Sequence, residues 1–129
     1  MIIDSSALVA ILRDEIESRA FANAIRNAKR RVLAAPTYLE TAMVIGGRKA
    51  EAGTAELDNL VAEVQIEIMP FSPAAARVAC HAFFSYGKGR HRAALNFGDC
   101  ISYAMAKTEL MPLLFKGHDF HLTDIESAL

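Results

Sequence analysis

Four short apolar runs divide the chain, and the spacing between them leaves room for one or two helices each time. The runs cover residues 1–4, 31–35, 66–70 and 112–117. The intervening patterns predict helices at 5–12, 14–29, 36–50, 54–65, 72–87 and 98–110, and a capping box at Thr123 and Glu126 predicts a last short helix or turn. Strands separated by helices pair in parallel and are covered on both faces. The sequence therefore predicts an α/β fold, a mostly parallel central sheet flanked by helices in an α/β/α sandwich.

Length and composition indicate one domain over residues 1–129. The 129 residues are 53% hydrophobic, and they contain no internal repeat or Pro/Gly/Ser-rich linker. No uncharged apolar stretch is long enough for a membrane span, and no basic segment precedes an apolar export signal, so we expect a cytoplasmic protein. Cys80 and Cys100 lack metal-site spacing and are expected to be reduced core thiols. The net charge of −1 means that a nucleic acid would have to be bound by a local basic patch.

Four acidic residues occupy positions where a charge is unexpected. Asp4 and Asp119 follow the first and last predicted strands, and the carboxyl ends of parallel strands meet at one edge of a sheet. Glu40 precedes Met43, Val44 and Gly47 on an apolar and small face of its helix, and Asp99 heads a stripe formed by Tyr103, Ala106 and Leu110. Asp4, Glu40, Asp99 and Asp119 are therefore the candidate catalytic residues.

Each acid also has a purely structural interpretation. Asp4 and Asp99 stand where helix N-caps would, Asp119 could be a turn residue, and Glu40 could pair with an arginine. If the four converge, however, their like charges require protonation or a hard cation, and oxygen ligands select Mg²⁺ or Mn²⁺. Such a centre hydrolyses phosphodiester bonds with a metal-activated water. Ser6 could hydrogen-bond a ligand carboxylate from the second layer of the site.

A basic loop at 87–97 leads into Asp99. Lys88, Arg90, His91 and Arg92 are candidates for contacts with an RNA backbone, although a run of charges is also typical of a solvated loop. His118 and His121 flank Asp119 and raise the alternative of a zinc site, which no third nearby ligand supports. Surface histidines in a turn are the default interpretation there.

Four stretches together resemble PIN-domain ribonucleases of the VapC toxin type: DSSALVAIL, YLETAMVI, YGKGRHRAALNFGDCISYAMAK and LLFKGHDFHLTDI. They span nearly the whole chain in order. The resemblance implies an Mg²⁺-dependent endoribonuclease with Asp4 and Asp99 as direct metal ligands. It also implies inhibition of translation by cleavage of transfer or ribosomal RNA, neutralisation by a VapB-like antitoxin, and a homodimer. His118 departs from the family, whose members often carry Asn or an acid at this position.

Two other functions remain open from the sequence. One is a catalytically silent PIN-like module that only binds a partner. The other is a receiver-like phospho-acceptor domain, suggested by Lys116 at the end of a strand; Ser5 argues against it, because receivers usually carry adjacent acids at the end of the first strand. A phosphatase of the haloacid-dehalogenase type would require an acid at position 6, where this chain has Ser6.

Overall fold

The computed structural model describes the backbone of residues 1–129 and all side chains except those of Arg48 and Lys49. Helices and strands alternate along most of the chain. Their bounds are β1 (Ile2–Ile3), α1 (Ser5–Leu12), α2 (Ser18–Asn27), β2 (Val32–Ala34), α3 (Ala35–Lys49), α4 (Glu51–Glu63), β3 (Glu67–Met69), α5 (Pro73–Tyr86), α6 (Phe97–Glu109), β4 (Leu113–Leu114) and a 3₁₀ helix, η1 (Asp119–Leu122). Over the described residues, no helix combines the length and the apolar character needed to cross a membrane.

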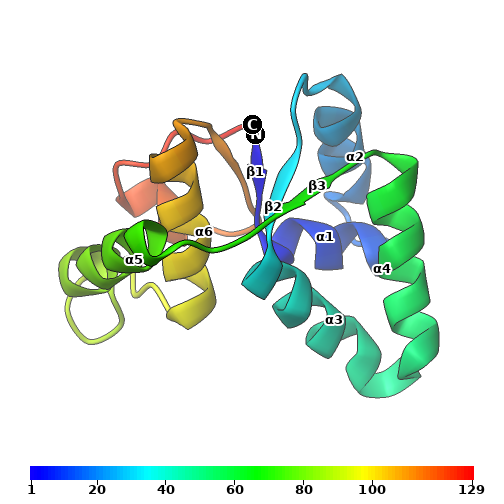
Figure 1. Ribbon diagram of the computed structural model, residues 1–129, viewed down its shortest axis with the longest axis horizontal. Helices are drawn as coiled ribbons and strands as arrows, with labels where there is room; N and C mark the ends of the chain where they lie inside the picture. Colours follow the sequence, from blue (N-terminus) through cyan, green and yellow to red (C-terminus); the bar gives the residue numbers. More distant parts are fainter.

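The strands form one parallel sheet in the order β3-β2-β1-β4. Ile2 of β1 pairs with Val32 on one side and with Leu113 on the other. Helices lie on both sides of this sheet, with α5 and α6 on the left in Figure 1 and α1, α2 and α4 on the right. The predicted α/β sandwich is confirmed.

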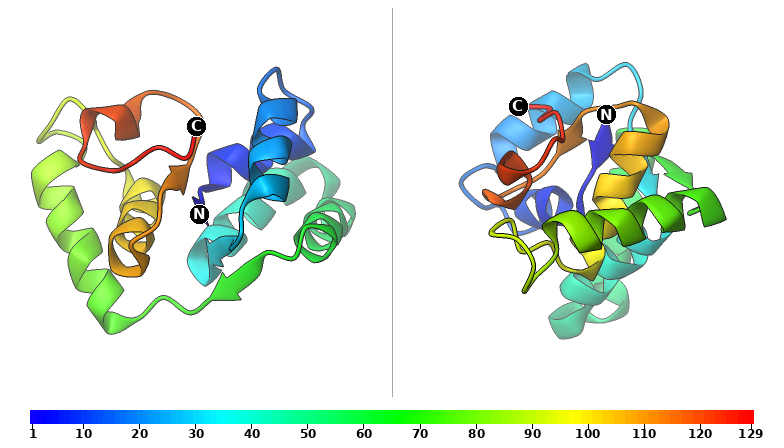
Figure 2. Two further views of the ribbon diagram at one scale, coloured as in Figure 1. Left: turned by 90° about the horizontal axis from the view of Figure 1, so that it is seen from above. Right: turned by 90° about the vertical axis from the view of Figure 1, so that its left-hand side faces the viewer.

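Successive strand residues belong to opposite cores, as expected from the period-two alternation of a strand. Ile2, Val32 and Leu113 pack in one core with residues of α5 and α6. Ile3 and Leu33, one residue further along their strands, pack in a second core with residues of α1, α2 and α4. Figure 2 shows the two groups of helices separated by the sheet. β1, β2 and β4 are thus buried on both faces, which explains why they read as continuous apolar runs, whereas Glu67 and Ile68 of the edge strand β3 are exposed.

The strand order contains a topological switch point between β1 and β4. The chain steps from β1 to β2 to β3 in one direction and then crosses to β4 on the opposite side of β1. Connections that diverge in this way leave a crevice beyond the carboxyl ends of the two strands, where ligands of open α/β sheets bind. Asp4 follows β1 and Asp119 follows β4, so both come from the rim of that crevice.

Two helix starts differ from the sequence prediction. Helix α2 begins at Ser18 rather than at residue 14, because Asp14 has a φ of 51°, outside the helical range; Glu15 and Glu17, ahead of the helix, form ion pairs with Lys116. Helix α4 begins at Glu51 rather than at residue 54. Ala50, with φ of 47°, makes a one-residue corner whose carbonyl accepts the N–H of Gly53.

The predicted helix or turn at Thr123 is only partly right, because the chain turns there but no helix begins. The Thr123 hydroxyl donates to the carbonyl of Phe120, closing η1, and accepts the N–H of Ile125. The chain then runs beside β4, where Leu113 N–H donates to Glu126 O and Leu113 O accepts from Ala128 N–H, both at 2.9 Å. We call residues 126–128 the tail segment.

Candidate active site

Asp4 stands where β1 ends and α1 begins, and it is 3% exposed. It is the N-cap of α1, because its Oδ2 accepts the backbone N–H of Ser6 at 2.9 Å. The Ser6 hydroxyl bonds the same oxygen at 2.5 Å, and the Ser102 hydroxyl of α6 bonds Oδ1 at 2.5 Å. The cap interpretation is therefore correct for Asp4, and it leaves the predicted ligand role open, since Oδ1, the oxygen that does not cap the helix, retains an acceptor position.

Ser6 connects Asp4 to the end of β4. Its hydroxyl oxygen accepts the backbone N–H of Lys116 at 3.0 Å. The ammonium of Lys116 lies 2.6 Å from Glu15 Oε2 and 3.0 Å from Glu17 Oε2, so it ties β4 to the connection between α1 and α2. This lysine is engaged with surface acids, which argues against the receiver-like alternative.

Glu40 lies on α3, and the apolar side chains three and four residues after it are not core. Met43 is 68% exposed and Val44 is 42% exposed. The sequence correctly indicated an acid on an apolar face. That face, however, is open to solvent, so the burial of the Glu40 carboxylate comes from other elements.

The Glu40 carboxylate is buried against the start of α6. A Cβ on Gly98 would lie 2.5 Å from Glu40 Oε1 and 2.6 Å from Oε2, so only glycine admits this close approach. Among the described side chains, Glu40 Oε2 is buried and accepts no hydrogen bond. Burial, followed by the charge of Asp4, raises the pKa of Glu40, while a hydrogen bond from Ser5 acts in the opposite direction.

Asp99 lies in the first turn of α6. The N-cap of this helix is Asn96 rather than Asp99: Asn96 Oδ1 accepts the N–H of Asp99 at 2.9 Å, and Asp99 Oδ2 accepts the N–H of Asn96 at 2.8 Å. The pKa of Asp99 is raised to about 6, chiefly by burial and further by the charges of Asp4, Asp119 and Glu40, while the hydrogen bond with the Asn96 backbone acts in the opposite direction. The four predicted acids therefore act on one another electrostatically.

Asp119 is the most open of the four acids. It begins η1 and is exposed, as are the neighbouring His118 and His121. The His121 ring packs edge-on against Phe115 with 4.9 Å between ring centroids. Within the described side chains, no three His, Cys, Asp or Glu residues are grouped as they would be around a bound ion, so the geometry does not support the zinc alternative.

The four acids nevertheless supply the type of ligand atom, oxygen, that a hard divalent cation prefers. All four acids offer oxygen, and a buried oxygen of Glu40 has no partner among the described groups. Mg²⁺ is commonly bound through only one or two carboxylates, with water and substrate phosphate completing its coordination. A preformed group of three ligands is therefore not required.

Comparison with known proteins identifies the family. Residues 1–126 match the family model described as the PIN domain. The chain belongs to the PIN-domain family. It is 46% identical over 128 residues to VapC ribonuclease Mb0640 of Mycobacterium bovis, covering 99% of this chain and 98% of the relative. The identity is also 46% over 128 residues to ribonuclease VapC of Mycolicibacterium smegmatis, covering 99% of both chains. This PIN domain is thus of the VapC type.

Solved structures agree on the fold. The crystal structure of Mycobacterium tuberculosis VapC20, described as a sarcin-ricin loop cleaving toxin, matches with a TM-score of 0.77 and 10% identity over 96% of this chain and 95% of that one. A toxin-antitoxin complex from Klebsiella pneumoniae matches with a TM-score of 0.70 and 18% identity over 92% of this chain and 88% of that one. At such low identity, both matches speak for the PIN fold alone.

The basic loop of this PIN domain packs against aromatic side chains. The guanidinium of Arg90 lies 4.8 Å from the ring centroid of Phe84 and 5.5 Å from that of Phe83. The His91 ring packs edge-on against Tyr86 at 5.3 Å. Lys88 and Arg92 are exposed. No described contact joins these four basic residues to the acids, so their predicted role in binding RNA stays a prediction.

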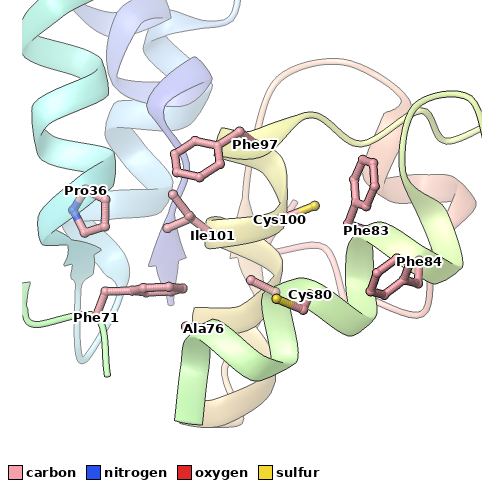
Figure 3. Close-up of a pocket in the computed structure, with 10 residues that line it drawn as sticks. Pro36, Phe71, Ala76, Cys80, Phe83, Phe84, Phe97, Cys100 and Ile101 are labelled. Carbon is pink, nitrogen blue, oxygen red and sulfur yellow. The ribbon is translucent and has the colours of Figure 1, made fainter. Parts of the chain in front are cut away.

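An apolar groove of about 500 Å³ lies next to the acids, between α5, α6 and the start of α3. Figure 3 shows Phe71, Cys80, Phe84, Phe97 and Ile101 around it. Cys100 is buried as expected, and burial raises the pKa of its thiol to about 11. Cys80, in contrast, is exposed in the groove wall, so it is not a core thiol.

Sequence reasoning missed three residues of the site. Ser102 follows Asp99 by one helical turn in an otherwise apolar stripe, and a polar residue in that position is a weak signal. Gly98 stands beside an acid at a helix start, where small residues are common. Ser5 stands out in the sequence only as a neighbour of Asp4. Their contacts with Asp4 and Glu40 depend on how α3, α6 and β1 pack together.

Proposed function

We propose that residues 1–129 form a single nuclease domain, a cytoplasmic Mg²⁺-dependent endoribonuclease in which Mn²⁺ can replace Mg²⁺. It would act as the toxin of a VapBC-type pair and inhibit translation by cleaving RNA. One observation carries the proposal. Near the switch point of the parallel sheet, burial and the charges of Asp4, Asp119 and Glu40 raise the pKa of Asp99, and the value is about 6 against the opposing hydrogen bond with Asn96. The close identity to VapC ribonucleases supports the reaction class.

We assign each acid a role from its surroundings in the structure. Asp4 and Asp99 would hold the ion, with Ser6 positioning Asp4. When bound, Mg²⁺ would supply water activation and neutralisation of charge on the scissile phosphate. Glu40, a half-buried carboxylate whose pKa is raised by burial and by the charge of Asp4, is suited to accept a proton from the attacking water. Asp119 would orient water at the open rim of the site.

The substrate we propose is a structured RNA, transfer or ribosomal. The net charge of −1 gives no general attraction for a polyanion. Lys88, Arg90, His91 and Arg92 would therefore supply the phosphate contacts, on the segment that leads directly into α6 and Asp99. The acidic residues that bind the metal ion and the basic residues that bind the RNA backbone would then lie on adjoining segments.

The partners we propose are a VapB-like antitoxin and a second copy of this chain. Leu39 and Met43, one turn apart on α3, are 59% and 68% exposed, and Phe84 and Phe97, which both line the apolar groove, are 61% and 83% exposed. Exposed apolar surfaces of this kind are typical of protein interfaces. An antitoxin arginine that reached the acids would compete with Mg²⁺ for their oxygens. High Mg²⁺ should then weaken inhibition, and an arginine-to-alanine antitoxin should still bind but inhibit poorly. An inhibited complex that keeps its full complement of metal at low Mg²⁺ would argue for blocked RNA access instead.

The deciding experiment incubates the purified protein with total RNA and Mg²⁺ and sequences the new RNA ends. Parallel samples contain a chelator or the Asp99→Asn protein. We expect ends at defined positions in the first sample and at none in the other two. Equal cleavage in all three would point to a contaminating nuclease, and no cleavage in any would favour the silent binding module.

A further inference from the structure

Three hydrogen-bond donors surround the Asp4 carboxylate. Two of them, the N–H and the hydroxyl of Ser6, bond Oδ2 at 2.9 and 2.5 Å. The third is the Ser102 hydroxyl, which bonds Oδ1 at 2.5 Å. A carboxylate offers about four acceptor positions, two on each oxygen. Oδ2 is therefore saturated, and one acceptor position remains on Oδ1.

The direction of these bonds is set by their neighbours. Ser6 Oγ accepts the backbone N–H of Lys116, so its own proton is available for Asp4. Ser102 is 1% exposed, and water has no access to replace its hydroxyl if it is removed. Among the described side chains, Ser102 is the one that donates a hydrogen bond to Oδ1.

Ser102 also links the two predicted cation ligands. It lies on α6, one helical turn after Asp99, while Asp4 follows β1. The bond from Ser102 to Asp4 spans 98 residues of sequence and fixes the start of α6 against the end of β1. A change at this contact would alter both the rotation of the Asp4 carboxylate and its placement relative to Asp99.

We propose that Ser102 is a positioning residue for divalent-cation binding, which holds Asp4 so that a single acceptor position of Oδ1 is left for the ion. The proposal rests on the metal-dependent function proposed above and adds to it a residue that never contacts the ion itself. A purely structural Ser102 would instead affect folding and leave cation affinity unchanged.

The test measures Mn²⁺ and Mg²⁺ binding by calorimetry on the full-length protein without RNA, so no activity is needed. The variants are Ser102→Ala, which removes the hydroxyl, and Ser102→Thr, which keeps it. Thr108→Ala is the matched control, because Thr108 lies further along α6 and its hydroxyl bonds only backbone carbonyls in the described structure. Circular dichroism and the melting temperature without metal report on folding.

We expect Ser102→Ala to bind Mn²⁺ about 10- to 100-fold more weakly, the usual loss when a group that orients a metal ligand is removed. Ser102→Thr should stay within about threefold of wild type, and Thr108→Ala should be unchanged. Wild-type affinity in a folded Ser102→Ala protein would overturn the positioning role while leaving the nuclease intact. A wild-type protein that binds no better than Asp4→Asn would instead overturn the metal centre itself.

Discussion

The acidic site has an inner side, formed by Asp4, and an outer side, formed by Glu40 and Asp99, and the carboxylates of the two sides are stabilised in different ways. On the inner side, Asp4 receives three donors from Ser6 and Ser102. On the outer side, Glu40 keeps a buried oxygen without a described hydrogen-bond partner, and the pKa of Asp99 is raised to about 6. Asp4 is buried and Glu40 and Asp99 are half-buried, and the fold supplies the two sides with different hydrogen-bond donors. The inner acid is stabilised by the protein, whereas the outer acids depend on a proton or a cation.

The sharpest way to break this comparison is to replace one acid on each side. Asp4→Asn and Asp99→Asn should both reduce RNA cleavage by roughly a thousandfold, because each removes a ligand charge and a bound metal contributes several kcal/mol to such reactions. Cleavage rates of the purified variants with Mg²⁺ provide the measurement. A folded Asp99→Asn protein that cleaves at the wild-type rate would remove Asp99 from the metal site.

The stabilities of the same two proteins should diverge. Without metal, Asp4→Asn should lose about 1–3 kcal/mol, since an amide NH₂ would face a hydroxyl donor in a buried position. Asp99→Asn should be as stable as wild type or more so, because it removes a charge that burial and three neighbours oppose. Equal losses in both variants, measured by denaturant unfolding with a chelator present, would mean that the two sides are not different.

Gly98→Ala tests the outer side by changing the space that is available to the Glu40 carboxylate. The new Cβ would lie 2.5 Å from Glu40 Oε1, so the carboxylate must move out of its place. We expect cleavage to fall by roughly ten- to hundredfold without loss of stability, because alanine is the better helix former and only a side-chain end must shift. Gly47→Ala is the control, since nothing described lies within 4 Å of a Cβ there. In a Glu40→Ala background, Gly98→Ala should have little further effect.

A smaller effect is expected from the basic loop. Arg90→Ala with Arg92→Ala should weaken RNA binding and reduce the slope of log affinity against log salt by about 0.7 for each phosphate that these side chains neutralise. The control removes two exposed cations from another region, Arg19 and Lys29, at and after α2. An unchanged slope in the loop variant would mean that Arg90 serves the aromatic packing on Phe83 and Phe84 and not the substrate.

The smallest expected effect is on the pH dependence of stability in a chelating buffer. A carboxyl whose pKa rises from 3.8 to about 6 on folding contributes stability below the lower value and loses it as the pH rises through the higher one. The melting temperature of wild type relative to Asp99→Asn should therefore fall by an amount on the order of a few degrees between about pH 4 and 6. Mg²⁺ should oppose this fall. A difference that is flat with pH would show that Asp99 titrates normally.

The inner side was the more predictable from sequence, and its local signals explain why. Asp4 interrupts two apolar runs at the end of a strand, and Ser6 is its near neighbour, so both could be singled out without the fold. Ser102 could not, because its contact with Asp4 arises only when α6 packs on β1 across 98 residues. Glu40 was identified from its apolar helix face, but its close contact with Gly98 could not be, because the two residues come from different helices.

The layering was also predictable, because doubly buried strands produce continuous apolar runs that helical segments separate. The ends of the helices were harder to predict from the sequence. Glu15 and Glu17 form ion pairs with Lys116 and do not belong to α2. Asn96 rather than Asp99 is the N-cap of α6. The pairing of Lys116 with Glu15 spans 101 residues and leaves no local pattern in the sequence, whereas the Asn96 cap is local, with its partner Asp99 three residues away, and was missed in the prediction.

The pairing of the tail segment with β4 has a practical consequence for handling the protein. An open sheet edge displays unpaired N–H and C=O groups that recruit strands from other molecules. Here the tail occupies both backbone groups of Leu113, and at the other end of the chain the amino group of Met1 donates to Arg30 O at 2.6 Å. Truncation before residue 126 would uncover β4, immediately beside the strand that carries Asp4, and would create a site for edge-to-edge aggregation. An affinity tag is therefore better joined after Leu129, with the tail left intact, than placed ahead of Met1.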